Sequence, residues 1–507
     1  MSHRYIPNTE HDIRRMLDAI GVASIDDLFE PVPESVRVKG GLKLPPALSE
    51  ADLLAHLEQL AAKNADASTH GIFLGGGVYR HFVPSFVDQL LLRSEFYTAY
   101  TPYQPEISQG TLQAIFEFQT MVCQLMGTDI ANASMYDGST AMAESALMAT
   151  RLTRRDRVVV ARSVHPDYRA VLATYAENLG LPVVEVGYTP AGAVDLEALR
   201  QAADGAAAVV FQYPNFLGVI EDPRAIVQAV RPTGAMTIAV VTEPVAMGML
   251  APPGELGVDI VAAELQSFGI PAAFGGPHCG VVAASEKCLR QMPGRLVGMA
   301  KDTEGRTGYV LTLATREQHI RREKATSNIC TNSGLMALCA SIFMAAYGKQ
   351  GLPDLARLNF DKAHHAQQQI LRGAPAARAR FGAPFFNEFV LSGLGDAARV
   401  HQRLLDQKIV AGVPLARYYP ELKDSVLICV TELNSAGEIE RLADAIAAAI
   451  RAPTGTRKTA TAEVARKPKG VKPVVRGART ASSGRARPGT ARRPAGSGSS
   501  GAARTRR

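Results

Sequence analysis

Six short apolar runs recur between residues 158 and 284 of this 507-residue chain, with segments of helical character between them. Runs of about four to six apolar residues, spaced by about 20 to 30 positions, are typical of βαβ units, in which helices join consecutive parallel strands. The pattern predicts a large α/β domain on a mostly parallel sheet. The runs start near Val158, Pro182, Ala206, Thr237, Ile260 and Gly280.

Helical and mixed segments flank this region. Thr9 with Asp12, and Ser49 with Asp52, have the spacing of helix-start signals, so a helix is expected after each pair. A buried helix is expected at 112–127, and a smaller α+β region follows at 384–450. We therefore expect four parts: an N-terminal helical segment that wraps the body (1–65), the large α/β domain (66–334), a small C-terminal α+β domain (335–451) and a basic tail (452–507).

The charge of the chain is divided unevenly. The net charge is +7, but residues 452–507 contain 15 Lys and Arg and a single acid, Glu463, so the other 451 residues carry a net −7. The tail has almost no large apolar side chains and is expected to be disordered. The whole chain is 47% hydrophobic and 20% charged, which excludes collagen, coiled coil and wholesale disorder.

Membrane, secretory and metal-binding classes are not expected. No run of 18 apolar residues occurs, and the first residues lack the apolar core of a signal peptide. The six cysteines include no CxxC pair and have no histidine cluster at metal spacing. The sequence therefore predicts reduced thiols, a cytoplasmic location and no metal site.

Three groups of residues that could take part in binding or catalysis lie near predicted strand ends or a predicted helix start. Gly138, Ser139 and Thr140 precede an Ala-rich helix, where free backbone N–H groups can hold an anion or where the hydroxyls simply cap the helix. His165 follows the first predicted strand and Glu243 follows the fourth, at the edge where α/β sheets bind ligands. Each of these two also has a structural interpretation, as a buried strand-end histidine and as a turn cap before Pro244.

Together, these features have the layout of a fold-type I pyridoxal phosphate protein. The phosphate would bind at the helix start, the imidazole would stack on the ring, and the acid would pair with the pyridine nitrogen. Such a site needs a lysine, because only an amine forms the Schiff base. Between Lys63 and Lys287 the chain has no lysine over 223 residues, so the sequence predicts a retained fold with lost covalent chemistry.

The segment at 71–84 contains Gly75-Gly76-Gly77 and ends at Pro84. It is interpreted as a loop and not as a phosphate-binding loop, because no Gly-Lys-Ser/Thr follows it.

Several longer segments resemble a known family, subunit 1 (the alpha subunit) of the two-subunit P-proteins of the glycine cleavage system. The 11-residue run from Tyr100 to Gly110 is the most specific of them, and the resemblance covers residues 1 to about 450. The other matching segments are Arg4 to Glu10, Met135 to Ser139, Gln212 to Phe216 and Phe385 to Phe389.

The resemblance implies that the pyridoxal lysine belongs to the beta subunit. Aligning Phe268-Gly269-Ile270-Pro271 with the family's catalytic motif places Gln266 at the lysine, so no catalytic residue is expected in this chain. The degenerate cofactor pocket would consist of Gly138, Ser139, Thr140, His165, Glu243 and Gln266. Related alpha subunits carry Asp-Pro where this chain has Glu243-Pro244.

The resemblance also implies partners. The complex would be an alpha2-beta2 heterotetramer that decarboxylates glycine with pyridoxal phosphate held by the beta subunit and passes the aminomethyl group to lipoylated H-protein. Tyr100, Tyr103 and Gln104 are candidates for the wall of the partner's active site, although tyrosines also pack inside subunits. No membrane contact is expected.

Two alternatives from other classes remain open at this point. The chain could be a stand-alone pyridoxal lyase that uses a relocated lysine, Lys287 or Lys324. It could also be a scaffold that binds nucleic acid through its basic tail. The net charge of −7 on the other 451 residues argues against this role, because a surface that binds nucleic acid should be basic.

Overall fold

The computed structural model describes residues 5–313, 318–329 and 331–451. The tail predicted at 452–507 lies outside the described residues.

The N-terminal segment contains two predicted helices, α1 (Glu10–Ile20) and α2 (Glu50–Ala61). Thr9 and Ser49 cap them as expected, each accepting the backbone N–H three residues ahead. Leu17 is the single buried side chain of the two helices. That this segment wraps the body remains a prediction.

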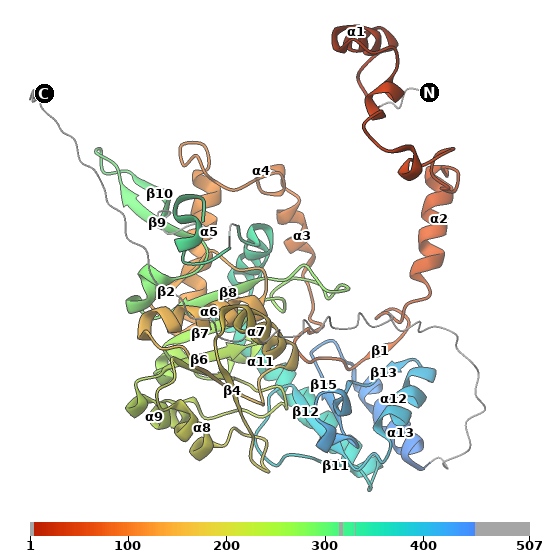
Figure 1. Ribbon diagram of the computed structural model, residues 1–507. Coiled ribbons are helices and arrows are strands. Elements are labelled where there is room, and N and C mark those ends of the chain that lie inside the picture. Colours follow the sequence, from red (N-terminus) through yellow and green to blue (C-terminus); the bar gives the residue numbers. More distant parts are fainter. Residues whose placement is uncertain (1–4, 314–317, 330, 452–507) are drawn as a thin grey trace, which may run out of the picture. The chain divides into compact units, whose positions relative to one another are not determined.

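The large domain is built on a seven-stranded sheet in the order β2-β8-β7-β6-β5-β3-β4 (Figure 1). Strands β3 to β7 run parallel, whereas β8 is antiparallel to both of its neighbours, β7 and β2. All six predicted apolar runs form strands. The strands are β2 (Ile130–Ala131), β3 (Val158–Ala161), β4 (Val183–Val186), β5 (Ala208–Gln212), β6 (Met236–Val241), β7 (Ile260–Glu264) and β8 (Gly280–Ala284).

Helices bury this sheet. Every residue of β3 and of β5 to β8 is buried, as in parallel sheets that are covered on both faces. Helix α6 lies against β5 to β8, and α8 and α9 pack on neighbouring strands. The helices are α3 (Ser85–Leu91), α4 (Ser94–Tyr97), α5 (Gln109–Met126), α6 (Gly138–Thr153), α7 (Pro166–Leu179), α8 (Leu196–Ala203) and α9 (Pro223–Val230).

A hairpin and a short helix follow the sheet. Strands β9 (Leu296–Lys301) and β10 (Thr307–Thr312) pair antiparallel, and α10 spans Gln318–Arg321.

Helix α11 (Gly334–Gly373) links two hydrophobic cores. It is kinked at Gly348, where the backbone is not helical. Phe343 before the kink belongs to the core of the large domain, and Ile370 after it belongs to the C-terminal core. By length and composition alone, this helix could span a membrane. One third of its most apolar stretch is buried inside the protein.

The C-terminal region has the predicted α+β character (Figure 1). Its antiparallel sheet has the order β11-β12-β15-β14 and contacts α11 and α12, which in turn pack against α13. A separate parallel pair joins β1 to β13 and draws residues 71–72 into this region. The bounds are β1 (Gly71–Ile72), β11 (Arg378–Ala379), β12 (Glu388–Ser392), α12 (Ala397–Asp406), β13 (Ile409–Val410), β14 (Val413–Pro414), β15 (Val426–Cys429) and α13 (Ala436–Arg451).

Candidate functional site

The predicted pocket residues gather at the carboxyl edge of the large sheet. His165 follows β3, Glu243 follows β6, and Gln266 follows β7. Because the carboxyl ends of parallel strands share one edge, the three side chains face one region, as the sequence predicted. The same segment contacts all three of them. We call this segment, residues 73–84, the strap.

An internal carboxylate meets the start of α6. The backbone N–H of Gly138 donates to Glu264 Oε2 at 2.9 Å. The other oxygen, Oε1, accepts the backbone N–H groups of Gln266 at 3.0 Å and Cys279 at 2.9 Å. Glu264 is 1% exposed, so the helix start already holds an anion that belongs to the chain.

The two hydroxyl residues of this turn act as helix-start residues. Ser139 Oγ donates to Asp137 Oδ1 at 2.6 Å, and the Thr140 N–H donates to the same oxygen at 2.8 Å. Thr140 and Asp137 complete a capping box. The residue that caps the helix is therefore Asp137, whereas Ser139 and Thr140 lie in the first turn with their hydroxyls donating to it.

His165 is turned toward the strap. Its Nδ1 accepts the N–H of Asp167 at 3.1 Å, so we assign the ring proton to Nε2, which lies 2.6 Å from the carbonyl oxygen of Gly76. Burial lowers the pKa of His165, which keeps the ring neutral. The imidazole therefore serves as a donor to the strap backbone.

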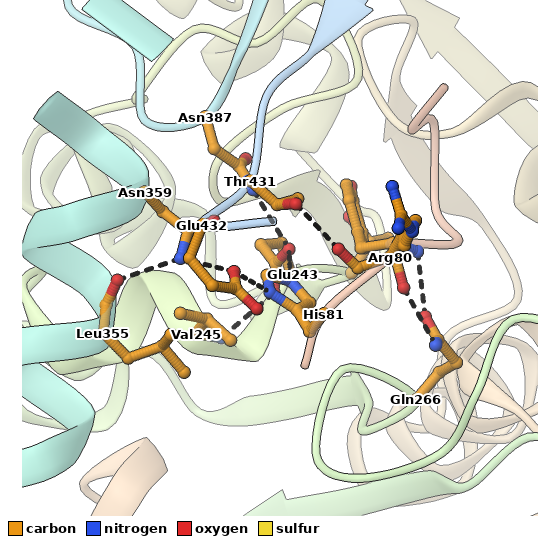
Figure 2. A network of polar contacts seen from close by, with 12 residues as sticks. Arg80, His81, Glu243, Val245, Gln266, Leu355, Asn359, Asn387, Thr431 and Glu432 are labelled. Atoms are coloured by element: carbon orange, nitrogen blue, oxygen red, sulfur yellow. Dashed lines mark hydrogen bonds and ion pairs between the residues drawn. The ribbon is translucent and has the colours of Figure 1, made fainter. Parts of the chain in front are cut away.

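Glu243 lies in a closed network of polar side chains (Figure 2). Its Oε1 caps the following turn by accepting the N–H of Val245 at 3.1 Å. Its Oε2 accepts from His81 Nε2 at 2.9 Å and from the amide of Asn387 at 3.1 Å. The predicted turn cap is present, and the carboxylate is saturated by groups of this chain.

His81 bridges two carboxylates that come from different cores. Its Nε2 faces Glu243, and its Nδ1 lies 2.8 Å from Glu432 Oε2 (Figure 2). Because ionised carboxylates only accept hydrogen bonds, both ring nitrogens must donate, which requires an imidazolium. Burial alone would lower the pKa of His81, but Glu243 and Glu432 outweigh it and raise the pKa to about 10. The same contact lowers the pKa of Glu432, although burial opposes this.

Gln266 occupies the position where the lysine is expected. Its Oε1 accepts the N–H of Tyr79 at 2.9 Å, and its Nε2 donates to the carbonyl oxygens of Tyr79 at 3.0 Å and of Ile270 at 2.6 Å. The residue is 2% exposed. The side-chain amide thus both accepts a hydrogen bond from the backbone of Tyr79 in the strap and donates one to it.

The far side of the strap is bound to the C-terminal core. Glu388 Oε1 accepts the N–H of Gly76 at 2.6 Å, and Oε2 accepts the hydroxyl of Tyr79 at 2.9 Å. Burial raises the pKa of Glu388 to about 7, although these two hydrogen bonds act against the rise. This carboxyl group therefore changes charge near neutral pH.

These contacts show that the site does not fit pyridoxal phosphate. Glu264 binds the start of α6, and Gln266 has an amide where the lysine amine is needed. The acid after β6, Glu243, is bound by His81. The strap backbone also takes the Nε2 hydrogen bond of His165, the imidazole expected to stack on the cofactor ring.

Neither lysine of the relocated-lysine alternative lies at this edge. Lys287 pairs with Asp259, which directly precedes β7 and so lies at the opposite, amino edge of the sheet. Lys324 is exposed and borders a cavity together with Arg151 and Arg290.

The loop at 100–104 lies on the surface. Tyr100 and Tyr103 are 83% and 58% exposed, and Gln104 is exposed as well. The hydroxyl of Tyr103 lies 3.1 Å from a guanidinium nitrogen of buried Arg295, which also donates to Thr101. Tyr100 and Thr101 line a cavity of 210 Å³ beside α5 and α11.

Sequence reasoning missed the strap and its partners. Two signals were available: three consecutive glycines often mark a close approach of backbone to another group, and an acid ends one of the apolar runs. The contacts that matter most join segments that are far apart in the sequence. The missed residues are Tyr79, His81, Glu264, Glu388 and Glu432.

Comparison with known proteins identifies the family. Residues 3–446 match the family described as glycine cleavage system P-protein. The chain belongs to this family. The P-protein resemblance drawn from the sequence is therefore confirmed, and the lyase and nucleic-acid alternatives are not supported.

The relatives of the chain agree with this assignment. A probable glycine dehydrogenase (decarboxylating) subunit 1 from Brevibacillus brevis is 51% identical over 453 residues, which cover 89% of this chain and all of that protein. A crystal structure of glycine decarboxylase (P-protein), in inhibitor-bound form, is 43% identical with a TM-score of 0.80, covering 88% of this chain and 100% of that one.

A more distant likeness concerns the fold alone. A cysteine desulfurase structure from Thermococcus onnurineus NA1 is 16% identical with a TM-score of 0.57, covering 76% of this chain and 95% of that one. The predicted fold class is confirmed as the fold-type I pyridoxal-enzyme fold, with a mostly parallel central sheet.

Proposed function

We propose that this chain is the subunit of a two-subunit glycine-decarboxylating P-protein that does not anchor the cofactor. One observation carries the proposal: the lysine position holds Gln266, whose amide is fully engaged by Tyr79 and Ile270. An amide cannot form a Schiff base, so the covalent chemistry must belong to another chain. The naming of relatives as subunit 1 supports the existence of that second chain.

The division of labour follows from this assignment. Subunit 2 holds pyridoxal phosphate through its lysine, and two copies of each subunit form an alpha2-beta2 heterotetramer in the cytoplasm. The complex decarboxylates glycine and passes the aminomethyl group to lipoylated H-protein. This chain contributes structure and part of the surface around the partner's site.

Tyr100, Tyr103 and Gln104 form that surface in our proposal. Their exposure, the anchoring of the loop by Arg295 and the neighbouring cavity support it. An exposed aromatic side chain held by a buried cation loses little conformational entropy when a partner binds, which suits a contact surface.

The test is reconstitution from separately purified subunits. We expect neither chain alone to release CO2 from glycine, and the mixture to do so in the presence of H-protein. Borohydride reduction of the complex should place the pyridoxyl label on a lysine of subunit 2. A pyridoxyl-lysine peptide from this chain, or decarboxylation by this chain alone, would overturn the assignment.

A further inference from the structure

We propose that the strap and Glu264 are internal substitutes for the cofactor. Between them they bind, from within the chain, the Gly138 N–H, His165, Glu243 and Gln266, which the fold-type I layout would turn toward pyridoxal phosphate. The proposal rests on the contacts of this chain alone and goes beyond the absence of the lysine. It predicts that restoring the lysine does not restore cofactor binding.

The first substitution is at the anion site. The N-terminus of a helix attracts an anion through its free N–H groups. Here Glu264 supplies that anion, binding the N–H of Gly138 while buried at 1% exposure. Glu264 also accepts two further backbone N–H groups, from Gln266 and Cys279, so its position is fixed from three directions. A phosphate brought to this helix start would meet a buried carboxylate.

The second substitution is at the imidazole of His165. The Gly76 carbonyl oxygen accepts a hydrogen bond from His165, and a Cβ atom at Gly77 would lie 2.8 Å from His165 Nε2. Gly76 and Gly77 have φ values of +73° and +101°, which strain any other residue. The glycines therefore allow the strap backbone to lie in contact with the imidazole and to take the Nε2 hydrogen bond from within the chain.

The third substitution is at the strand-end acid. In the fold-type I layout, this acid pairs with a protonated pyridine nitrogen. Here Glu243 pairs with another protonated heterocycle, the imidazole of His81 (Figure 2). The ion pair is buried, with side-chain exposures of 2% and 3%.

The fourth substitution is at the lysine. Gln266 exchanges two hydrogen bonds with the backbone of Tyr79, at 2.9 and 3.0 Å. A lysine at this position would lose the acceptor that the Tyr79 N–H requires, and its amine would point into the strap. The strap would have to leave before an aldehyde could reach that amine.

The strap is also fixed from the other side, which distinguishes it from a movable lid. Thr431 Oγ1 donates to the Arg80 carbonyl oxygen at 2.7 Å, and the Cys429 N–H donates to that of Phe73 at 3.1 Å. Glu388 and Glu432 hold Gly76 and His81. Opening the strap would break these bonds together and leave buried charges without partners, which is strongly unfavourable.

The Gln266→Lys variant provides the test. The variant and the wild type are incubated with pyridoxal phosphate, reduced with borohydride and digested, and the peptide containing residue 266 is examined by mass spectrometry. Subunit 2, treated identically, is the positive control. We expect less than a tenth of the introduced lysine to carry the pyridoxyl group, against nearly complete labelling of the lysine of subunit 2. Labelling of a tenth or more of the introduced lysine would overturn the proposal.

Hydrogen exchange measures in the wild-type chain, without any mutation, whether the strap opens. Peptides covering residues 73–84 should exchange as slowly as peptides covering β6, and millimolar pyridoxal phosphate should not change their exchange rate. Exchange on the time scale of an unprotected loop, or a rate that responds to pyridoxal phosphate, would overturn the proposal even if Gln266→Lys failed to fold.

The two proposals fail in different ways. Labelling of the wild-type chain would refute the non-anchoring function, whereas labelling of the Gln266→Lys variant alone would refute the internal substitution and leave that function intact.

Discussion

The Nε2 atom of His81 lies 2.9 Å from Glu243 Oε2, and both side chains are almost completely buried. Glu243 follows β6 of the large sheet, and His81 belongs to the strap. With Glu432 on the other ring nitrogen, the imidazolium joins the large domain to the C-terminal core. A strand-end acid that the sequence predicted as a cofactor contact therefore holds the two parts of this chain together.

Removal of His81 should destabilise the chain severely. His81→Ala leaves Glu243 and Glu432 buried without the cation between them. Breaking a buried ion pair from one side costs about 3 to 5 kcal/mol, so the midpoint of chemical unfolding should fall clearly. Urea unfolding followed by circular dichroism measures the change. His56→Ala on the exposed face of α2 is the matched control, and we expect it to shift the unfolding free energy by less than about 0.5 kcal/mol.

Glu388 should make stability depend on pH. Its pKa is raised by burial to about 7 in the folded chain, whereas a glutamate in an unfolded chain titrates near about 4.3. Between these values the folded state binds the proton and the unfolded state does not, so stability falls as the pH rises. This contribution is fully present below about pH 4 and is lost above about pH 7.

Glu388→Gln removes this titration and keeps an acceptor for the Gly76 N–H. The loss of thermal stability between pH 5 and pH 7.5 should therefore be smaller in the variant than in the wild type. The His81 contribution, whose pKa is raised to about 10, persists in both proteins over most of this range and cancels in the comparison. Equal pH dependence in the two proteins would contradict the prediction.

The sheet could be predicted because its strands are buried on both faces. Such strands appear as continuous apolar runs, and all six runs proved to be strands. Strand β2 escaped prediction because two residues, Ile130 and Ala131, are too short for a periodic signal. The helix starts at Thr9 and Ser49 were predictable because capping depends on neighbouring residues alone.

The candidate site was predictable only in part. His165, Glu243 and Gln266 follow strands, so topology alone places them at one edge. What closes the site is a set of contacts over long sequence separations: His81 and Glu432 are 351 residues apart. No local pattern encodes such a pair, and Gly75-Gly76-Gly77 suggested only a loop. The strap could therefore be located as a segment but not assigned a place in the fold.

The basic tail should be dispensable for assembly and catalysis. Residues 452–507 carry 15 basic side chains and almost no large apolar ones, so they supply little surface for a packed core. A chain truncated after Arg451 should form the complex with subunit 2 and decarboxylate glycine at the wild-type rate. Size-exclusion chromatography and CO2 release measure the two properties. Loss of either one in the truncated chain would show that the tail is functional.

Substitution of Tyr103 distinguishes two roles for this residue, contact with the partner subunit and packing within this chain. Its side chain is 58% exposed, and within the chain its hydroxyl contacts Arg295 at 3.1 Å. Removing a fully buried aromatic side chain costs about 3 to 5 kcal/mol, but an exposed one contributes far less to the fold. Tyr103→Ala should therefore leave the thermal midpoint of the isolated chain within a few degrees of the wild type, and lower glycine decarboxylation by the reconstituted complex at least tenfold.

Tyr103→Phe is the matched control, because it keeps the ring over Arg295 and removes only the hydroxyl. If the ring forms part of the partner's site, this variant should retain most of the activity that Tyr103→Ala loses. A large fall in the thermal midpoint of Tyr103→Ala would instead assign the tyrosine to packing within the subunit. Wild-type turnover with a wild-type midpoint would refute both roles, since the ring would then contribute neither to the fold nor to the complex.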